Sequence, residues 1–269
     1  MVSWIRRNIV LILGLLVLLY MYIPNAVVVL MSFNDSSKHR NLYRFQSFTW
    51  HNWTGLCDPS GLCHSVMISV WLGLLATLIA TVIGTMGAFA LVRHDFHGRG
   101  AMNMILFLPM ASPEIVMGSS LLALFVASGF GGQLGFWTIL IAHVMFCLSF
   151  VVVTVKSRLA GLDENLEQAA MDLYATPAQT FWRVTFPLVF PGVLGAALLS
   201  FSLSFDDFII TNLNAGQTVT FPMYIWGAAQ RGVPMQVNVI GTMMLLISLV
   251  VVISGEVLSR RRAKMYAAA

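Results

Sequence analysis

The sequence contains unusually little charge. Only 10% of its 269 residues are Asp, Glu, Lys or Arg, whereas soluble domains contain roughly 25%. Hydrophobic residues make up 58% of the chain, and the mean hydropathy is +0.82. So few charges cannot cover a protein surface in water. The composition therefore excludes an ordinary soluble protein and predicts one embedded in a membrane.

Cysteine is also scarce, and the motifs of common cofactor sites are missing. Three scattered cysteines do not form a metal-binding framework, so we expect no metal site. The sequence has neither a glycine-rich phosphate loop nor a nucleophile–base set, so we expect no catalytic residue and no cofactor in this chain. The net charge of +4 is not interpreted as nucleic-acid binding, because the basic residues fall in short clusters between apolar runs.

Six apolar segments are long enough to cross a bilayer, which needs about 20 residues per helix. They predict an all-α, polytopic membrane protein that is one transmembrane domain over residues 1–269. The expected crossings are approximately residues 9–31, 66–92, 102–127, 137–155, 188–213 and 237–258. The third is interrupted by Pro109 and Pro113.

The basic residues predict the orientation. With the N-terminus in the cytoplasm and six crossings, 11 of the 15 Lys and Arg residues lie on the cytoplasmic side. The excess agrees with the rule that basic loops stay cytoplasmic. We therefore expect a multi-pass protein of the inner membrane with both termini in the cytoplasm. The cytoplasmic set is Arg6, Arg7, Arg93, Arg99, Lys156, Arg158, Arg183, Arg260, Arg261, Arg262 and Lys264, and the outer set is Lys38, Arg40, Arg44 and Arg231.

The first long loop, residues 32–65, is expected outside the cell membrane. It contains Cys57 and Cys63, separated by turn-forming residues. A disulfide between them is chemically reasonable in an oxidising compartment, and two free thiols are the alternative. Cys147 and His143 lie in an apolar run. We expect Cys147 to be a small buried apolar residue and His143 to be a hydrogen-bonded packing residue rather than a ligand.

The second long loop, about residues 156–187, is expected in the cytoplasm. Apolar residues recur at three- and four-residue steps in its first half, which predicts an amphipathic helix. These residues are Leu162, Leu166, Ala169, Ala170 and Leu173. Tyr174 and Ala175 break the pattern, and Thr176 followed by Pro177 is a typical start of a second short helix.

This loop resembles the coupling loop of ATP-binding-cassette (ABC) importer permeases of the binding-protein-dependent, type I class. The pattern of that family is Glu-Ala-Ala, three residues, Gly, nine residues and Ile-x-Leu-Pro. Here Gln168, Ala169 and Ala170 occupy the triplet, and Tyr174 stands at the glycine position. The closing residues are Val184, Phe186 and Pro187, with Glu167 immediately before the triplet. Tyrosine adopts positive φ at a cost, so the turn geometry stays open.

The resemblance implies a type I permease fold and a mechanism. A short helix of the loop would dock into a groove on a separate ATP-binding subunit, whose closure would move the membrane helices. The implied partners are a second homologous permease, two ATP-binding subunits that hold ATP and Mg, an extracytoplasmic substrate-binding protein and the lipid bilayer. The coupling residues carried over are Glu167, Gln168, Ala169, Ala170, Asp172, Tyr174, Thr176, Pro177 and Pro187.

Two other interpretations of the chain remain. The amphipathic segment could lie on the membrane surface. The whole chain could also be an ATP-independent secondary carrier or a membrane scaffold. A membrane-embedded enzyme is disfavoured because no catalytic set is visible.

Two further segments resemble the second membrane subunit of spermidine/putrescine importers. One is Leu108 to Gly118, with a Pro-Glu-Ile string, and the other is Leu199 to Phe208, with Ser-Phe-Asp-Asp-Phe. The resemblance implies a polyamine as the transported solute. An amino acid, thiamine or an iron chelate are the alternatives.

The chemistry of these segments agrees with a cationic solute. An ionised carboxylate inside a bilayer costs about 2.5–3.5 kcal/mol on insertion scales, so it needs a cavity, a partner or a cation. Glu114, about twelve residues into its predicted helix, is expected near mid-membrane, and Asp206 and Asp207 near the outer end of the fifth crossing. Rings could add cation–π contacts. The candidate substrate-path residues are Glu114, Phe205, Asp206, Asp207, Phe208, Tyr224 and Trp226.

These candidates also have structural interpretations. Glu114 could hydrogen-bond backbone that Pro109 and Pro113 leave unpaired. One of Asp206 and Asp207 should cap or brace a helix, because neighbours on a helix point about 100° apart. The aromatic residues could anchor the chain at the membrane interface.

Overall fold

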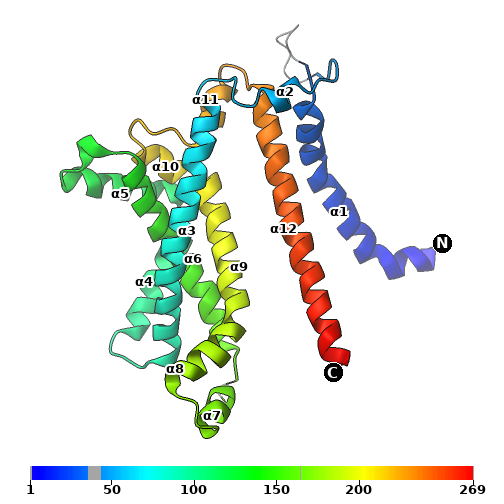
Figure 1. Ribbon diagram of the computed structural model, residues 1–269. Helices are drawn as coiled ribbons and strands as arrows, with labels where there is room; N and C mark the ends of the chain where they lie inside the picture. The colour runs from blue at the N-terminus through cyan, green and yellow to red at the C-terminus, as the bar shows by residue number, and fades with distance from the viewer. Residues whose placement is uncertain (1, 36–43, 164, 269) are drawn as a thin grey trace. The chain divides into compact units, whose positions relative to one another are not determined.

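The computed structural model describes residues 2–35, 44–163 and 165–268. Lys38 and Arg40, two of the basic residues predicted on the outer side of the membrane, are not among the described residues. Helices dominate the described chain (Figure 1). It divides into two compact units, residues 1–63 with 225–269 and residues 64–224.

Unit 1 pairs the first and last long helices. Helix α1 (Val2–Ser32) packs along α12 (Met235–Ala268). A Cβ on Gly241 would lie 3.2 Å from Cγ1 of Val28, so the two helices approach closely there. The short α2 (His51–Thr54) packs on α12, and the Asn52 amide donates to the carbonyls of Ser32 and Asn34 at 3.0 and 2.9 Å. These bonds tie α2 to the end of α1.

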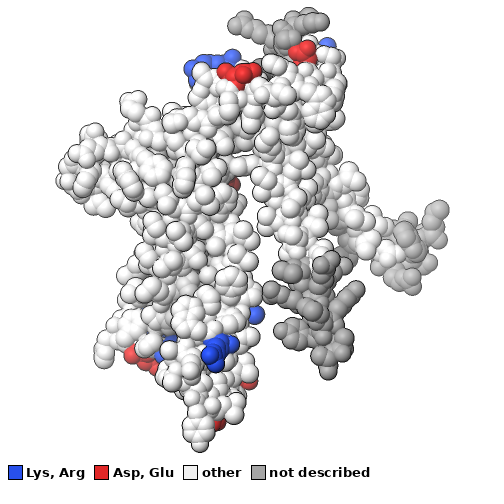
Figure 2. Space-filling model, viewed as in Figure 1, with Lys and Arg blue, Asp and Glu red and all other residues white. Residues whose placement is uncertain are grey.

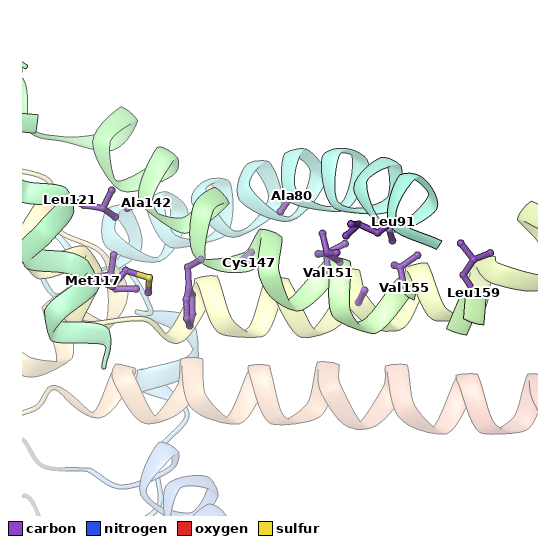
Figure 3. Close-up of a cluster of buried hydrophobic side chains, with 14 of the residues drawn as sticks. Ala80, Leu91, Met117, Leu121, Ala142, Cys147, Val151, Val155 and Leu159 are labelled. Atoms are coloured by element: carbon purple, nitrogen blue, oxygen red, sulfur yellow. The ribbon is translucent and has the colours of Figure 1, made fainter. Parts of the chain in front are cut away.

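Unit 2 is built around α6 (Phe136–Ala160). It packs along α9 (Phe186–Asp206), and α3 (Leu62–Arg93) covers another side (Figure 3). A Cβ on Gly84 of α3 would come within 2.6 Å of Val151 on α6. Small residues let helices approach in lipid, where dispersion contacts replace the hydrophobic effect.

The third predicted crossing is not one helix, contrary to the expectation for residues 102–127. Helix α4 (Arg99–Ala111) ends before Ser112, and α5 (Glu114–Ala127) begins after Pro113 at an angle of 110° (Figure 1). Residues before proline disfavour the helical region, and proline donates no backbone hydrogen bond. Pro109 is accommodated inside α4, whereas Pro113 marks the break. Glu114 is consequently the first residue of α5 rather than a mid-helix residue.

The fifth predicted crossing also ends earlier than residue 213. Helix α9 stops at Asp206, Asp207 is extended with ψ 127°, and α10 (Ile209–Asn214) follows. Helix α10 packs on α5. A Cβ on Gly118 would come within 3.2 Å of the Ile210 Cα, so glycine permits this packing. The remaining short helices are α7 (Asn165–Asp172), α8 (Pro177–Thr180) and α11 (Phe221–Ala229).

The described chain has five helices that are long and apolar enough to cross a membrane, and the bent pair α4–α5 makes a sixth candidate. The five are Asn8–Ser32, Leu62–Arg93, Phe136–Ala160, Pro177–Asp206 and Met235–Gly255. Figure 2 shows that the long helices present an almost uncharged surface, with blue and red side chains mainly near their ends. The prediction of an all-α membrane protein is confirmed.

Candidate functional site

The segment expected to couple to an ATP-binding subunit folds as two short helices, as the sequence predicts. Tyr174, after α7, has φ 63°, the left-handed conformation for which the family uses glycine. Thr176 then caps α8: its hydroxyl accepts from Gln179 N at 3.3 Å, and the Gln179 amide oxygen accepts from Thr176 N at 3.0 Å. Pro177 is the first residue of α8. Despite the change of residue, the glycine-type turn is kept.

Glu167 faces into unit 2. Its Oε1 accepts from Arg93 Nη2 at 2.7 Å and from the Thr185 hydroxyl at 2.8 Å. Arg93 is the last residue of α3, and Thr185 ends the π-helical turn Phe181–Thr185 that joins α8 to α9. One carboxylate oxygen therefore links α3, α7 and the start of α9.

A pocket of about 550 Å³ lies beside this contact. Its walls come from the last turns of α3, from α7 and from the π-helical turn, and include Phe89, Arg93, Glu167, Met171 and Phe181. The lining is mostly apolar, with the Arg93–Glu167 ion pair as part of the wall.

The opposite side of α7 has no partner within the described chain. Leu166 and Leu173 are 45% and 82% exposed, and Tyr174 is 96% exposed. Leu166, Ala169 and Leu173 recur at helical spacing and form an exposed apolar stripe. Of the predicted coupling residues, Gln168, Asp172, Thr176, Pro177 and Pro187 are also exposed, and Ala170 is half-buried.

The three predicted carboxylates come together where two helices are broken. Glu114 opens α5 after the first break, and Asp206 and Asp207 lie at the second. Glu114 interacts electrostatically with both aspartates. Glu114 and Asp206 are exposed, whereas Asp207 is buried. The packing of α10 on α5 produces this arrangement, supported by the Asn214 amide, which donates to the Gly118 carbonyl at 3.1 Å.

Asp207 is the carboxylate that braces a helix. Its Oδ2 accepts from Thr211 N at 2.8 Å and from the Thr211 hydroxyl at 2.7 Å. His143 Nε2 lies 3.4 Å from the same oxygen. Asp207 lies two residues before α10, and an acidic side chain at the start of a helix also suits the positive end of its dipole. Asp206 has no such role and points to an exposed position.

The predicted ring partners are distributed differently. Phe205 is buried; it stacks with Phe201 at a centroid distance of 5.9 Å and packs at a tilt against Phe221 at 6.0 Å. Phe208 is half-buried at the start of α10. Tyr224 is the last residue of unit 2, whereas Trp226 belongs to unit 1. Unit 2 alone therefore contributes Phe205, Phe208 and Tyr224.

Cys57 and Cys63 form a disulfide with a Cα–Cα distance of 5.3 Å, and Cys147 is a buried free thiol. The bond fixes the chain between α2 and the first turn of α3. In unit 1 the rings of Phe33, Trp50 and Trp53 pack together, with Phe33–Trp53 centroids 5.4 Å apart.

Comparison with known proteins decides the family. The model of the family described as "Binding-protein-dependent transport system inner membrane component" matches residues 80–264. The chain belongs to this family. It is thus a multi-pass component of the inner membrane that belongs to a family of transport components.

The sequence is similar to those of named permeases over most of its length. Haemophilus influenzae PotC, "spermidine/putrescine transport system permease protein", is 37% identical over 90% of this chain and 93% of its own. Escherichia coli K12 PotI, "putrescine transport system permease protein", is 34% identical over 89% and 85%.

A solved structure shares the fold. A chain of a bacterial ABC transporter involved in the import of the acidic polysaccharide alginate matches with a TM-score of 0.63 and 16% identity, over 96% of both chains. The predicted family and permease fold are therefore confirmed.

Some interacting residues of this transport component were missed from the sequence. His143 was interpreted as a hydrogen-bonded packing residue with no partner named, and no side-chain contact was predicted for Arg93, Thr185, Ser204 or Thr211. A signal was available for three of them: His143, Ser204 and Thr211 are polar residues inside apolar runs. Buried polar groups almost always have hydrogen-bond partners, so several in neighbouring crossings predict a network.

Proposed function

We propose that this chain forms half of the transport path for a polyamine such as spermidine or putrescine in an ATP-driven importer. Its partners would be a second homologous permease, two ATP-binding subunits that hold ATP and Mg, and an extracytoplasmic binding protein. Both termini would lie in the cytoplasm, and the loop 32–65 would lie outside. The second permease is needed because one bundle provides only one wall of a path.

The observation that carries the cargo assignment is the group of carboxylates at the two helix breaks. Glu114 and Asp206 are exposed, and Glu114 lies near enough to Asp207 and Asp206 for their charges to interact. Asp206 also ends α9, and the C-terminal end of a helix carries partial negative charge. Broken helices that present their ends and acidic side chains at one place are typical of ion and substrate sites in transporters.

A polyamine fits this chemistry better than an anionic or neutral solute. Its ammonium groups are spaced along a flexible chain, so two exposed carboxylates could each hold one in turn. Individual sites in a path must be weak enough for cargo to leave. The names of the relatives PotC and PotI agree with this cargo.

The exposed stripe on α7 supports coupling to an ATP-binding subunit. Leu166, Leu173 and Tyr174 form an apolar surface that no described part of the chain covers. Glu167, by contrast, is held by Arg93 on the opposite side. The stripe would dock into the ATP-binding subunit while the other face remains attached to the membrane helices.

Uptake by the reconstituted complex tests the cargo. The complete transporter in liposomes, supplied with ATP inside and binding protein with labelled putrescine or spermidine outside, should accumulate the polyamine. Glu114→Gln and Asp206→Asn should each lower the uptake rate about tenfold, the effect of losing one charge-assisted contact. Asp95→Asn removes an exposed carboxylate paired with Arg99 and should transport normally.

Each outcome has a distinct meaning. Normal uptake in both Glu114→Gln and Asp206→Asn, with correct assembly, would contradict the cargo path. Uptake of an amino acid, thiamine or iron chelate in place of polyamine would assign another cargo to the same fold. Uptake that survives ATP removal and stops when the ion gradient collapses would identify a secondary carrier.

A further inference from the structure

His143 belongs to a continuous hydrogen-bonded chain inside unit 2. Its Nδ1 lies 2.7 Å from the Ser204 hydroxyl, and its Nε2 lies 2.9 Å from the Thr211 hydroxyl. The Thr211 hydroxyl in turn lies 2.7 Å from Asp207 Oδ2. The side chains of His143 and Asp207 are only 2% and 3% exposed. The four residues come from α6, α9, α10 and the α9–α10 junction.

The direction of these hydrogen bonds follows from counting protons. The Thr211 hydroxyl has one proton, and its two acceptors on Asp207 are Oδ2 at 2.7 Å and the backbone carbonyl at 3.2 Å. Toward His143 it can therefore only accept, so Nε2 carries a proton and donates. In the neutral imidazole Nδ1 then accepts from the Ser204 hydroxyl. Ser204 thus donates to His143, His143 donates to Thr211, and Thr211 donates to Asp207.

We infer that His143 is a positioning residue that fixes the α9–α10 junction and thereby sets the direction of Asp206. The inference rests on the proposed function, in which Asp206 contacts the cargo. His143 acts through Thr211 on Asp207, the residue directly after Asp206. With Asp207 Oδ2 held by both the N–H and the hydroxyl of Thr211, the preceding peptide has little freedom to rotate.

Two isosteric substitutions at position 143 separate the two ring nitrogens. The amide nitrogen of Gln reaches the place of Nε2 and preserves the donor toward Thr211 and Asp207. The amide of Asn reaches only the place of Nδ1 and preserves the contact with Ser204. Thr211→Ser, which keeps the hydroxyl, and Thr211→Val, which keeps the shape without it, form a second matched pair.

The decisive measurement is the number of polyamine molecules transported per ATP hydrolysed by the reconstituted complex. His143→Asn and Thr211→Val should lower this ratio about tenfold, because Asp206 loses its orientation while the ATP-binding subunits still turn over. His143→Gln and Thr211→Ser should recover the ratio to within about twofold of wild type. A residue that only stabilises the fold would lower uptake and ATP hydrolysis together.

Identical ratios in the Gln and Asn variants, or a parallel fall in uptake and ATP hydrolysis, would overturn the inference. A readout without cargo separates it from the proposed function. In an Asp206→Cys variant, the rate of reaction with a charged thiol reagent should change with His143→Asn and not with His143→Gln. If wild type transports no polyamine but this difference remains, the cargo is wrong and the positioning role stands. If the thiol rates are equal, the positioning role is wrong.

Discussion

Arg93 Nη2 and Glu167 Oε1 lie 2.7 Å apart, although 74 positions separate the two residues in sequence. The contact joins the cytoplasmic end of α3, as proposed, to the helix that carries the coupling motif. Both side chains are largely shielded, at 19% and 25% exposed. Glu167 therefore acts within this chain, and the surface offered to another subunit is the opposite side of α7.

Reversing this ion pair gives the first prediction. Arg93→Glu or Glu167→Arg alone should weaken the attachment of α7 by about 1–2 kcal/mol, because each leaves two like charges in contact. Uptake should fall more than ATP hydrolysis, since the motor no longer moves α3. The double variant Arg93→Glu/Glu167→Arg should recover most of the uptake. A double variant no better than either single one would show that the pair does not transmit movement.

Tyr174 gives a prediction with two opposite effects. Its positive φ costs a non-glycine residue roughly 1 kcal/mol, so Tyr174→Gly should leave the thermal stability of the isolated permease equal or higher. The same change removes a ring that is 96% exposed and so available for docking. Co-purification of the ATP-binding subunit should therefore decrease. Tyr174→Phe, which keeps the ring, is the control, and unchanged co-purification in Tyr174→Gly would remove the ring from the docking surface.

The adjacent aspartates should respond differently to truncation. Asp207→Ala leaves the Thr211 N–H without its acceptor and leaves the Thr211 hydroxyl only the backbone carbonyl of residue 207, at 3.2 Å, so it should lower the free energy of unfolding by about 2–3 kcal/mol. Asp206→Ala removes an exposed side chain and should change it by no more than about 0.5 kcal/mol. Thermal unfolding in detergent measures both. Equal losses of stability would contradict the assignment of Asp207 as the brace.

The disulfide provides a test of orientation. After reduction, a membrane-impermeant maleimide added to intact spheroplasts should label Cys57 and Cys63, because the proposed topology places them outside. Without reduction neither should react, and buried Cys147 should stay unlabelled. Labelling only in inverted vesicles would reverse the proposed topology. Replacing both cysteines by serine should cost about 2 kcal/mol, from the lost constraint on a short loop.

The long helices and the coupling turn were predictable because their signals are local. Apolar run length predicted the five long apolar helices, and Thr176 with Pro177 predicted the start of α8. The conformation of Tyr174 could not be settled from the residue type, since tyrosine disfavours positive φ. The structure shows that Tyr174 nevertheless adopts positive φ.

The breaks and the buried network depend on contacts between distant segments. Pro109 and Pro113 have the same local chemistry, yet only Pro113 marks the end of a helix. The sequence raised the possibility that one aspartate braces a helix. The choice of Asp207 required the position of Thr211 and of His143, which lies 68 residues before Thr211. Pairings over such separations leave no periodic pattern to detect.

The helical path from Pro177 to Asp206 runs without a break for 30 residues, first as α8, then as a π-helical turn and then as α9. At about 1.5 Å per residue it extends about 45 Å. A continuous helix transmits a rotation from one end to the other. The number of residues between the coupling segment and Asp206 therefore fixes the direction of Asp206 relative to that segment. Inserting a single alanine within α9 would turn Asp206 by about 100° without removing any side chain. The π-helical turn closes its hydrogen bonds over one residue more than a regular turn, so it is the part of this helix that can accommodate an extra residue.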